Sequence, residues 1–455
     1  MPVSINPTIF RDYDIRGTYP DQLNEETYYV IGRALAEYLH VSQIAVGHDT
    51  RLSSPSLSKS LIRGIIDNGT NVVDLGLIST EIHYYASGSR NFPANVIISA
   101  SHNPGNYNGL KIVIKGVKPL HGNFGLPEIK KLTIEQNFSK IKKTGEVTKL
   151  DLMDQWIIHA LEFIDKSKLA NLKVVVDAGN GMGGISWKKL IGKTNVEIIP
   201  LYFKPDGHFP HHLPDPLKKE NLKDLISMIQ RNQADLGIAL DGDADRMFLV
   251  DEKGHEVSGT ITTAILADAL LSKEKGQSVL YNAVCGRIVP ETILKHQGRP
   301  VRVRVGHSFI KESMRMEKAL FAGEHSGHFY FRDNYYAESY LIAGLVILEY
   351  LSSKNRKLSE ISYEFNKYPS SGEINFKVED PQNCIKKAAT LFNGYKAKDW
   401  IDGLSVWYND WWFNLRVSKT ETYIRLNIEA DNKELLDNKL HFVENKIIEL
   451  NGVRV

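Results

Sequence analysis

The stretch Asn95-Val96-Ile97-Ile98-Ser99-Ala100-Ser101-His102-Asn103-Pro104 joins an apolar run to a turn. Its first four residues are typical of a buried strand, and the Asn-Pro pair followed by glycine is a turn signal. Ser101 therefore lies where a strand gives way to a loop, which is the usual position of catalytic groups in an α/β sheet. A serine there can act as a nucleophile if a neighbouring group activates it. Alternatively, Ser101 and Asn103 only cap the turn through bonds to the backbone.

Strands and helices alternate on both sides of this stretch. The apolar spacing predicts helices over 25–39 and 56–67 and strands over 44–47, 72–76 and 108–114. A polar loop is expected over 79–81, and a lysine-rich helical stretch over 127–143. This alternation predicts an α/β domain over residues 1–149.

A second α/β domain is predicted over 150–252, with a helix over 156–163 and strands over 172–177 and 196–199. Between the two strands, Gly179-Asn180-Gly181-Met182-Gly183-Gly184 fits the G-x-G-x-x-G spacing of a dinucleotide-binding turn. That fingerprint also requires an acidic residue at the end of the second strand. Glu197 lies inside this strand rather than at its end, so a NAD-dependent oxidoreductase stays only an alternative.

The strongest metal signal is Asp241-Gly242-Asp243-Ala244-Asp245-Arg246, between two predicted strands. Alternation with small residues places three carboxylates in one tight loop, which suits a hard divalent cation. Three like charges in one loop are costly unless a cation neutralises them. A calcium EF-hand does not fit, because Arg246 stands where glycine is required and the flanks are strands. A solvated acidic turn is the other alternative.

Two further polar loops stand out, one in each of the remaining predicted domains, 253–367 and 368–455. Gly323-Glu324-His325-Ser326-Gly327-His328 can hydrogen-bond several sugar hydroxyls, and its two histidines complete no tetrahedral metal set. Arg416-Val417-Ser418-Lys419-Thr420 follows an aromatic strand and can hold a phosphate by charge and hydrogen bonds. A plain β-turn is the alternative for this loop. An apolar helix is expected over 338–350.

Length and composition narrow the class of protein. A chain of 455 residues is too long for one core, so two to four domains are expected. A net charge of +2 gives no electrostatic case for nucleic acid or an anionic membrane. No apolar run approaches the ~20 residues needed to cross a bilayer. Because Cys285 and Cys384 cannot cross-link so large a chain, and no signal peptide precedes the first domain, we predict a cytoplasmic location.

Together these stretches resemble the α-D-phosphohexomutase family, and within it the bacterial phosphomannomutase/phosphoglucomutase group. The matching segments occur in family order at 10–17, 99–104, 241–246, 323–328 and 416–420. The resemblance implies an α/β fold of three related α/β domains with mixed sheets. A smaller C-terminal α+β domain would join them around a central active-site cleft.

The resemblance also implies a role for each candidate residue. Ser101 would carry a phosphoryl group, and its phosphate would complete a Mg²⁺ site with Asp241, Asp243 and Asp245. The residues expected to read the sugar hydroxyls are Glu324 and Ser326. The residues expected to hold the phosphate that is not reacting are Arg416, Ser418, Lys419 and Thr420. The residues expected to line the catalytic cleft are Tyr13, Arg16, Lys111, Arg246, His307 and His328.

The implied reaction starts from phosphoserine, which gives its phosphoryl group to a hexose phosphate. The resulting hexose 1,6-bisphosphate, intermediate and activator, returns its other phosphate to Ser101. Arg16, Lys111 or His328 would move the hydroxyl proton, and the sequence does not choose among them. The substrates would be mannose or glucose phosphates. Phosphoglucosamine mutase, where glutamine is expected in place of His325, and a non-catalytic sugar-phosphate-binding paralogue are alternatives; oligomeric state stays open.

Overall fold

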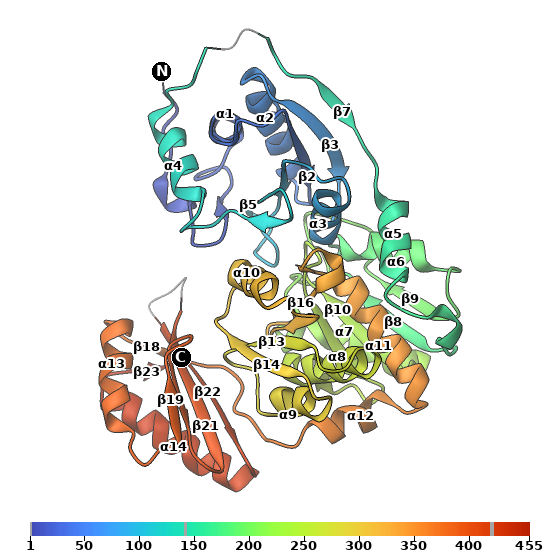
Figure 1. Ribbon diagram of the computed structural model, residues 1–455, viewed down its shortest axis with the longest axis vertical. Coiled ribbons are helices and arrows are strands. Elements are labelled where there is room, and N and C mark those ends of the chain that lie inside the picture. The colour runs from blue at the N-terminus through green and yellow to red at the C-terminus, as the bar shows by residue number, and fades with distance from the viewer. Residues whose placement is uncertain (1, 141–142, 419–422) are drawn as a thin grey trace. The chain divides into compact units, whose positions relative to one another are not determined.

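The computed structural model describes residues 2–140, 143–418 and 423–455 (Figure 1). They form two compact units. The first takes in Met1–Ser258, Gly306–Phe321 and Ser326–Ser359, and the second takes in Gly259–Val305, Ala322–His325 and Glu360–Val455. Across the described ranges, no helix combines the length and the apolar content that a membrane span requires.

The first sheet of the first unit has seven strands in the order β1-β5-β4-β2-β3-β7, with β6 beside β5. It is mixed, because β2 runs parallel to β3 and β4 whereas β5 is antiparallel to β4 and β1. The strands are β1 (Ile15–Thr18), β2 (Gln43–His48), β3 (Asn71–Leu77), β4 (Ala94–Ile98), β5 (Tyr107–Ile114), β6 (Lys118–Pro119) and β7 (Val147–Lys149). The helices are α1 (Glu25–Leu39), α2 (Ser54–Asp67), α3 (Thr80–Ser89) and α4 (Leu126–Glu135).

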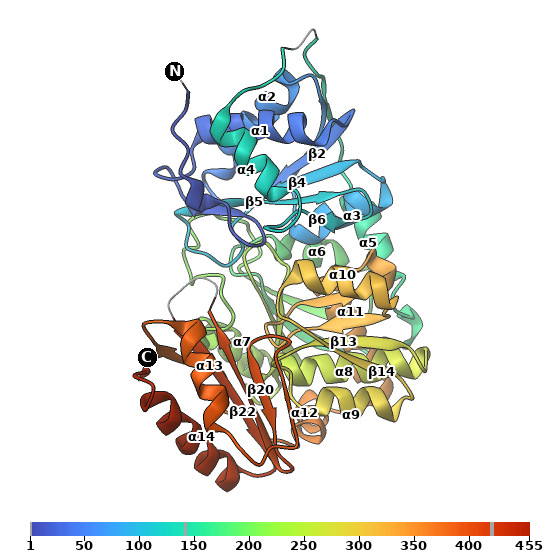
Figure 2. The same ribbon diagram turned by 60° about the vertical axis from the view of Figure 1, so that its left-hand side comes forward.

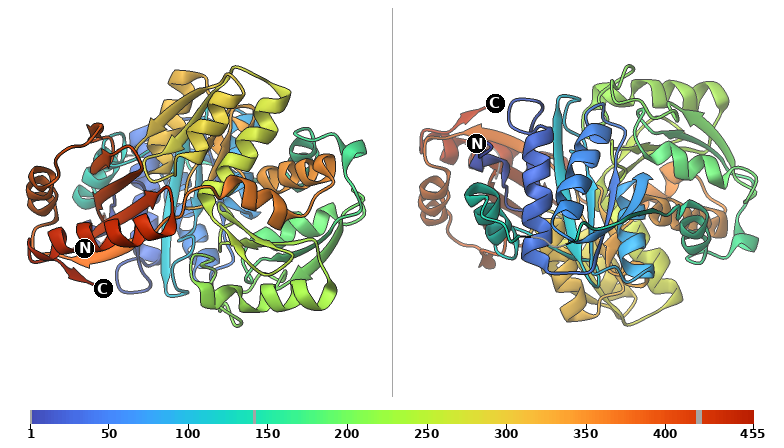
Figure 3. Two further views of the ribbon diagram at one scale, coloured as in Figure 1. Left: turned by 90° about the horizontal axis from the view of Figure 1, so that it is seen from below. Right: turned by 90° about the horizontal axis from the view of Figure 1, so that it is seen from above.

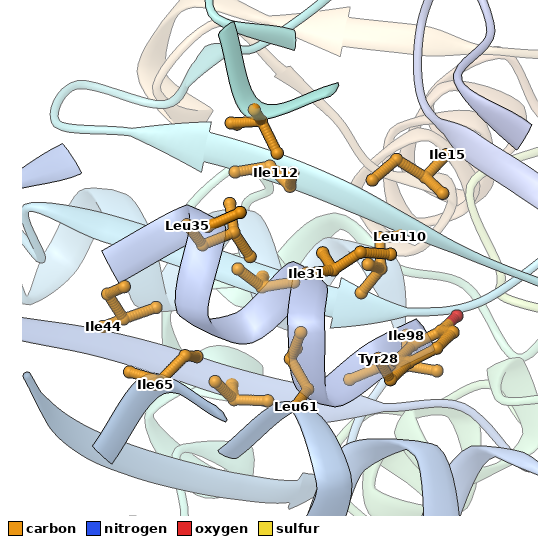
Figure 4. Packing of buried hydrophobic residues seen from close by; sticks show 14 of the residues in the cluster. Ile15, Tyr28, Ile31, Leu35, Ile44, Leu61, Ile65, Ile98, Leu110 and Ile112 are labelled. Carbon is orange, nitrogen blue, oxygen red and sulfur yellow. The ribbon is translucent and has the colours of Figure 1, made fainter. Parts of the chain in front are cut away.

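Helices α1 and α2 run side by side, as the two dark blue helices in the right-hand view of Figure 3. Two glycines allow this approach, because a Cβ on Gly32 would clash with the Leu61 carbonyl and a Cβ on Gly64 with that of Tyr29. Figure 4 shows Ile31 of α1 among side chains from α2 and from the sheet, all of them buried. This core fixes the strand ends from which the catalytic loops leave.

The predicted helix over 25–39 and the strands of this sheet are confirmed. Two predictions are wrong. The loop expected over 79–81 is the start of α3, for which Ser79 is the N-cap residue. The helix expected over 127–143 ends at Glu135, because Gln136 adopts a left-handed conformation (φ 50°) and donates its N–H to the Leu132 carbonyl.

The second sheet lies in the same unit and has the order β12-β11-β10-β8-β9. Strand β8 is parallel to β9 and β10, whereas β10 and β11 form an antiparallel pair joined by residues 241–246. The strands are β8 (Lys173–Asp177), β9 (Glu197–Leu201), β10 (Leu236–Leu240), β11 (Met247–Asp251) and β12 (Glu256–Val257). The helices of this segment are α5 (Met153–Leu161), α6 (Gly183–Leu190) and α7 (Lys223–Asn232).

The segment between β12 and the C-terminal sheet contributes to both units. In the second unit β13 (Ser278–Asn282) is parallel to β14 (Arg299–Val303), with α8 (Gly259–Lys273) and α9 (Ile288–Lys295) beside them in sequence. In the first unit β16 (Phe329–Phe331) is antiparallel to β17 (Ala337–Glu338). The remaining elements are α10 (His307–Glu317), β15 (Phe321–Gly323), α11 (Tyr340–Lys354) and α12 (Leu358–Phe365). Helix α11 is buried over 340–351, as expected for a core helix.

The C-terminal sheet is antiparallel throughout, in the order β19-β20-β21-β22-β18-β23. Helices α13 (Pro381–Leu391) and α14 (Lys433–Ile448) pack on it over an apolar core (Figure 2). The strands are β18 (Ile374–Lys377), β19 (Ala397–Asp399), β20 (Leu404–Trp407), β21 (Trp411–Val417), β22 (Tyr423–Ala430) and β23 (Val453–Arg454). The predicted fold class, three α/β domains with mixed sheets and a smaller α+β domain, is confirmed.

Candidate active site

Ser101 lies in the loop after β4 in a left-handed conformation, with φ of 52°. Its Oγ donates to Asp241 Oδ2 at 2.9 Å and lies 3.2 Å from His102 Nδ1. The turn is capped by Ser99, whose Oγ accepts the Ser101 N–H at 3.0 Å. Because the Ser101 hydroxyl is directed at a carboxylate 140 residues away rather than at its own turn, the capping alternative does not explain this residue.

The three loop aspartates converge at the β10–β11 turn. Each offers one carboxylate oxygen, these oxygens lie within 4.8 Å of one another, and all three side chains are buried. Asp241 Oδ1 accepts the backbone N–H groups of Asp245 and Arg246, which folds the loop back on its first residue. Burial and the charges of Asp245 and Asp243 raise the pKa of Asp241 well above its usual range. The solvated acidic turn is therefore contradicted.

Asp243 is held by one of its oxygens only. Oδ2 accepts from Thr80 Oγ1 at 2.6 Å, Lys111 Nζ at 2.6 Å and Ser99 Oγ at 3.2 Å. The Thr80 N–H also donates to the Asp243 carbonyl at 2.9 Å. Oδ1 is buried, and no group in the described ranges donates to it. Buried polar atoms almost always have a hydrogen-bond partner, so a buried carboxylate oxygen without a donor fits the role of a metal ligand.

The donor set fits a hard divalent cation. Three carboxylates outnumber the lysine and arginine side chains in contact with them, Lys111 and Arg246, and His328 Nε2 lies 3.3 Å from Asp245 Oδ1. Arg246 Nε stays at 3.8 Å from both Asp241 Oδ2 and Asp245 Oδ1, too far for a hydrogen bond. Oxygen-only ligands and a residual negative charge suit Mg²⁺, and the strands on both sides of the loop agree with the exclusion of an EF-hand.

Lys111 projects from β5 onto the same carboxylates, at 2.6 Å from Asp243 and 2.6 Å from Asp245. Burial opposes its charge, but the two carboxylates outweigh burial and raise the pKa of Lys111 above its ordinary value. Arg16 of β1 donates to Asn103 Oδ1 at 2.6 Å, and its NH2 donates to Asp14 at 2.5 Å. Lys111 therefore lies beside the aspartate loop, and Arg16 lies beside the Ser101 loop.

Segment 326–328 adds a hydroxyl and an imidazole to this cluster. Arg246 Nε donates to His328 Nε2 at 3.3 Å, and Ser326 Oγ lies 3.1 Å from His328 Nδ1. His307 begins α10, with its ring 5.8 Å from that of Tyr13. Burial, and then the charges of Lys311 and Lys111, lower the pKa of His307 well below its usual range. The first unit thus brings together eleven of the predicted site residues: Tyr13, Arg16, Ser101, Lys111, Asp241, Asp243, Asp245, Arg246, His307, Ser326 and His328.

The second unit holds the remaining candidates. Glu324 is buried and accepts from Asn282 Nδ2 at 3.3 Å. Arg416 NH2 donates to Glu373 at 2.7 Å. Arg425, opposite Arg416 in the β21–β22 pair, contacts Glu373 at 3.1 Å and donates to Ser418 Oγ at 3.4 Å. The other two predicted phosphate ligands, Lys419 and Thr420, lie outside the described residues.

The glycine motif over 179–184 does occupy a strand–turn–helix, between β8 and α6. Two of its glycines face protein backbone at close range. A Cβ on Gly181 would clash with Gly242, and one on Gly184 with Phe203. Met182 donates its N–H to the Gly242 carbonyl at 2.9 Å. The motif therefore supports the aspartate loop from behind, which explains its glycines without a dinucleotide.

Sequence reasoning missed four residues. Thr80 and Ser99 hold the predicted metal ligand Asp243 through their hydroxyls. The other two, Arg425 and Glu373, are charged residues that lie near Arg416. A threonine at the start of a helix usually indicates no more than a cap, so Thr80 carried no usable signal. Arg425 and Glu373 come from neighbouring strands, and only the sheet order places them beside Arg416.

Comparison with known proteins assigns the chain. Three family models match in succession, described as phosphoglucomutase/phosphomannomutase alpha/beta/alpha domain I over residues 7–143, domain II over 154–254 and domain III over 258–368. A phosphomannomutase of Escherichia coli is 37% identical over 433 residues, covering 93% of this chain and 95% of the relative. One of Methanocaldococcus jannaschii is 37% identical over 447 residues, covering 98% of each.

Among solved structures, a phosphoglucomutase/phosphomannomutase family protein from Burkholderia thailandensis superposes with a TM-score of 0.90. It is 29% identical and covers 98% of both chains. The matches run through the serine loop, the aspartate loop and the C-terminal sheet alike. The chain therefore belongs to the phosphoglucomutase/phosphomannomutase family, the α-D-phosphohexomutases that its motifs resemble.

Proposed function

We propose that this phosphohexomutase interconverts hexose 6-phosphate and hexose 1-phosphate, with mannose or glucose as the sugar. Ser101 would carry the phosphoryl group, and a hexose 1,6-bisphosphate would be the intermediate. The observation that carries this proposal is the contact of Ser101 Oγ with Asp241, inside a buried group of three carboxylates. A serine hydroxyl at that point can share its phosphate with whatever cation the carboxylates hold.

The reacting centre works through alignment and charge. Phosphoryl transfer requires an in-line geometry and neutralisation of the charge on the transferring group. When bound, Mg²⁺ held by Asp241, Asp243 and Asp245 would supply positive charge to the phosphoryl oxygens. Lys111 and Arg246 add two fixed cations beside the same carboxylates. Thr80 and Ser99 hold Asp243 so that its other oxygen stays available.

The sugar hydroxyl must lose a proton as it attacks phosphoserine, and the Ser101 oxygen must gain one as its bond to phosphorus breaks. In the second half-reaction Ser101 loses this proton as it attacks the other phosphate, and the departing sugar oxygen gains one. We propose that the group responsible is among Arg16, Lys111 and His328, which border the serine and aspartate loops. A guanidinium is better suited to hold a phosphate than to remove a proton, so Arg16 is the weakest of the three candidates. Lys111 and His328 remain, and mutating each in turn would show which of them transfers the proton.

Recognition of the sugar and of its idle phosphate would come from the polar loops. Glu324 and Ser326 would bind the sugar hydroxyls, and Tyr13, His307 and Arg246 would also bind the substrate. The idle phosphate would be bound by Arg416, Ser418, Lys419 and Thr420. Since each half-reaction leaves one phosphate unreacted, a single remote phosphate site serves both orientations of the substrate.

Two further features belong to the same proposal. We propose domain limits at 1–149, 150–252, 253–367 and 368–455, each placing one functional loop in one domain. We also propose a cytoplasmic location, supported by two cysteines, Cys285 and Cys384, that are buried and unpaired.

A coupled assay tests this function. Purified protein with Mg²⁺ and a hexose 1,6-bisphosphate is given mannose 1-phosphate, glucose 1-phosphate or glucosamine 1-phosphate, and formation of each 6-phosphate is followed. Turnover of the first two, abolished by a chelator and restored by Mg²⁺, is expected. Turnover of the glucosamine substrate alone would replace the proposal with phosphoglucosamine mutase, and no turnover of any substrate would favour the non-catalytic paralogue.

A further inference from the structure

We propose that Arg51, which lies in the loop after β2, is the positioning residue of the serine loop, defined here as residues 99–108. Its guanidinium holds this loop from behind and fixes the Ser101 backbone. The inference rests on the proposed function for its kinetic consequence. Its structural consequence can be measured whether or not the enzyme turns over a given sugar.

Four carbonyl oxygens of the serine loop converge on one guanidinium. NH2 donates to the carbonyls of Ser101 at 2.7 Å and Asn103 at 2.6 Å. NH1 donates to the carbonyls of Pro104 at 2.6 Å and Tyr107 at 3.1 Å. Arg51 is fully buried, with an exposed fraction of 0%.

Arg51 is itself fixed by the sheet. Its Nε lies 3.3 Å from Asp49 Oδ2, and its backbone N–H donates to Asp49 Oδ1 at 3.0 Å. Asp49 accepts from Ser54 Oγ at 2.5 Å and donates its own N–H to the Ile98 carbonyl, at the end of β4. The guanidinium is therefore tied to the same strand end from which the serine loop departs.

This support is needed because of the conformation of Ser101. A left-handed serine is strained relative to ordinary backbone and persists only where its surroundings over-determine it. The bond from Arg51 to the Ser101 carbonyl fixes the peptide on the C-terminal side of that residue, and Ser99 Oγ fixes the one before it. Together they direct Oγ at Asp241.

A planar trans peptide sets its N–H opposite to its C=O. Because the Ser101 carbonyl is turned onto Arg51, the His102 N–H points away from the guanidinium. Arg51 also places a permanent positive charge behind a residue that would carry a phosphate of nearly two negative charges. Lysine cannot replace this arrangement, since its single ammonium lacks the planar fork that serves four acceptors.

The test compares Arg51→Lys with a matched control, Arg33→Lys. Arg33 is a half-buried arginine of α1 that bonds Asn68 and packs on the Phe138 ring, outside the serine loop. Melting temperatures of both variants establish the cost in stability. Hydrogen exchange of the amides over 99–108 and steady-state kinetics with saturating Mg²⁺ then separate positioning from stability.

We expect Arg51→Lys to increase exchange over 99–108 and to lower kcat roughly tenfold to a hundredfold, the loss typical of a misplaced reacting group. KM for the hexose phosphate should stay close to wild type, because substrate binding does not use Arg51. Arg33→Lys should change neither exchange in this loop nor kcat. Unchanged exchange in Arg51→Lys, or a kcat equal to that of Arg33→Lys, would overturn the proposal.

A second variant covers the case in which Arg51→Lys does not fold. Asp49→Asn keeps the guanidinium and its four carbonyl bonds but removes the carboxylate beside Nε. We expect a smaller fall in kcat and a smaller gain in exchange, confined to the same loop. No change in either quantity would count against Arg51. Increased exchange over 99–108 in Arg51→Lys, together with a wild-type protein that shows no mutase activity, would refute the proposed function while leaving the positioning role intact.

Discussion

Two charged clusters, one in each unit, differ in whether carboxylates or basic side chains are in excess. In the aspartate loop, the carboxylates of Asp241, Asp243 and Asp245 outnumber the cations of Lys111 and Arg246. Beside the β21–β22 pair, the guanidiniums of Arg416 and Arg425 share the single carboxylate of Glu373. The first cluster therefore favours a cation and the second an anion, as a metal-dependent enzyme acting on phosphates requires.

The clusters also differ in burial. The carboxylates and Lys111 of the first have side chains at most 7% exposed, whereas Glu373 is 33% exposed and Arg425 27%. Charges in a buried cluster are screened little by water or salt, and their geometry is fixed by neighbours. Changes in the first cluster should therefore cost more activity than changes in the second. The predictions below test that order.

The largest effect is expected for Asp243→Asn. Oδ2 accepts from three donors, Thr80, Lys111 and Ser99, and Oδ1 is the oxygen left for the metal. The new amide has only one oxygen, so its NH2 group would either face the three donors or take the place of the metal ligand. We expect kcat to fall by at least about a hundredfold, because metal charge is worth several kcal/mol in the transition state. Asp251→Asn is the control, a buried aspartate of β11 that accepts the backbone N–H groups of Lys253 and His255 and lies 3.3 Å from the His255 ring. Equal losses in both variants would show that burial, not the metal, matters.

A smaller effect is expected for Arg416→Ala in the second cluster. KM for 1-phosphate and 6-phosphate substrates should rise alike, by roughly tenfold to a hundredfold, the value of one charge-assisted contact. Glu373→Gln should lower KM, because it removes the carboxylate that competes with phosphate for both guanidiniums. A KM change in one reaction direction only would show that this cluster does not bind the idle phosphate.

Thr80→Val should weaken the binding of Mg²⁺ rather than the binding of substrate. Valine keeps the shape and the backbone N–H but removes the hydroxyl that donates to Asp243 at 2.6 Å. We expect the Mg²⁺ concentration for half-maximal activity to rise about tenfold, the usual cost of losing a group that orients a metal ligand. Thr80→Ser should restore it. The Mg²⁺-induced rise in melting temperature provides a second readout, and an unshifted Mg²⁺ dependence would reject this role.

The smallest effect on catalysis is expected at Glu81, which anchors α3 behind Thr80. Its carboxyl accepts from Trp156 Nε1, Ser339 Oγ and the Leu341 N–H. In the second unit Glu429 also accepts from an indole, Trp412 Nε1, but is paired with Arg287 at 2.8 Å. Burial raises the pKa of Glu81 to about 8 despite its hydrogen bonds.

A raised carboxyl pKa means that the unfolded chain releases this proton at lower pH than the folded chain. The free energy of unfolding should therefore fall as pH rises from about 4.5 to about 8, by at most about 1.4 kcal/mol per pH unit from this group. Glu81→Gln should flatten that part of the melting-temperature profile with little change in kcat. A wild-type profile that rises with pH over this window would contradict the assignment.

The sequence predicted the fold elements well where periodicity was strong. The helix over 25–39 and the strands flanking Ser101 and Asp241 follow from apolar spacing. The errors came from local stops that spacing does not record. Gln136 ends α4 with a left-handed cap, and Thr80 begins a helix that lacks a strong amphipathic pattern.

The candidate site could be predicted only as separate loops. Ser101 and the three aspartates carry chemistry in their own residue types, so the sequence pointed to them directly. Thr80, Arg425 and Arg51 act through partners that are distant in sequence or belong to a neighbouring strand or loop. Arg51 was recognisable only as part of a polar loop, since its four acceptors are backbone carbonyls that no side-chain pattern encodes.

The central claim is that Ser101 carries the phosphoryl group beside the metal. The direct test is intact-protein and peptide mass spectrometry of wild type and Ser101→Ala after incubation with glucose 1,6-bisphosphate and Mg²⁺, with the mutase assay run on the same samples. We predict one phosphate, located on Ser101, in wild type, and neither phosphate nor turnover in Ser101→Ala. Full mutase turnover by Ser101→Ala, or phosphate on another residue of an active enzyme, would contradict the account.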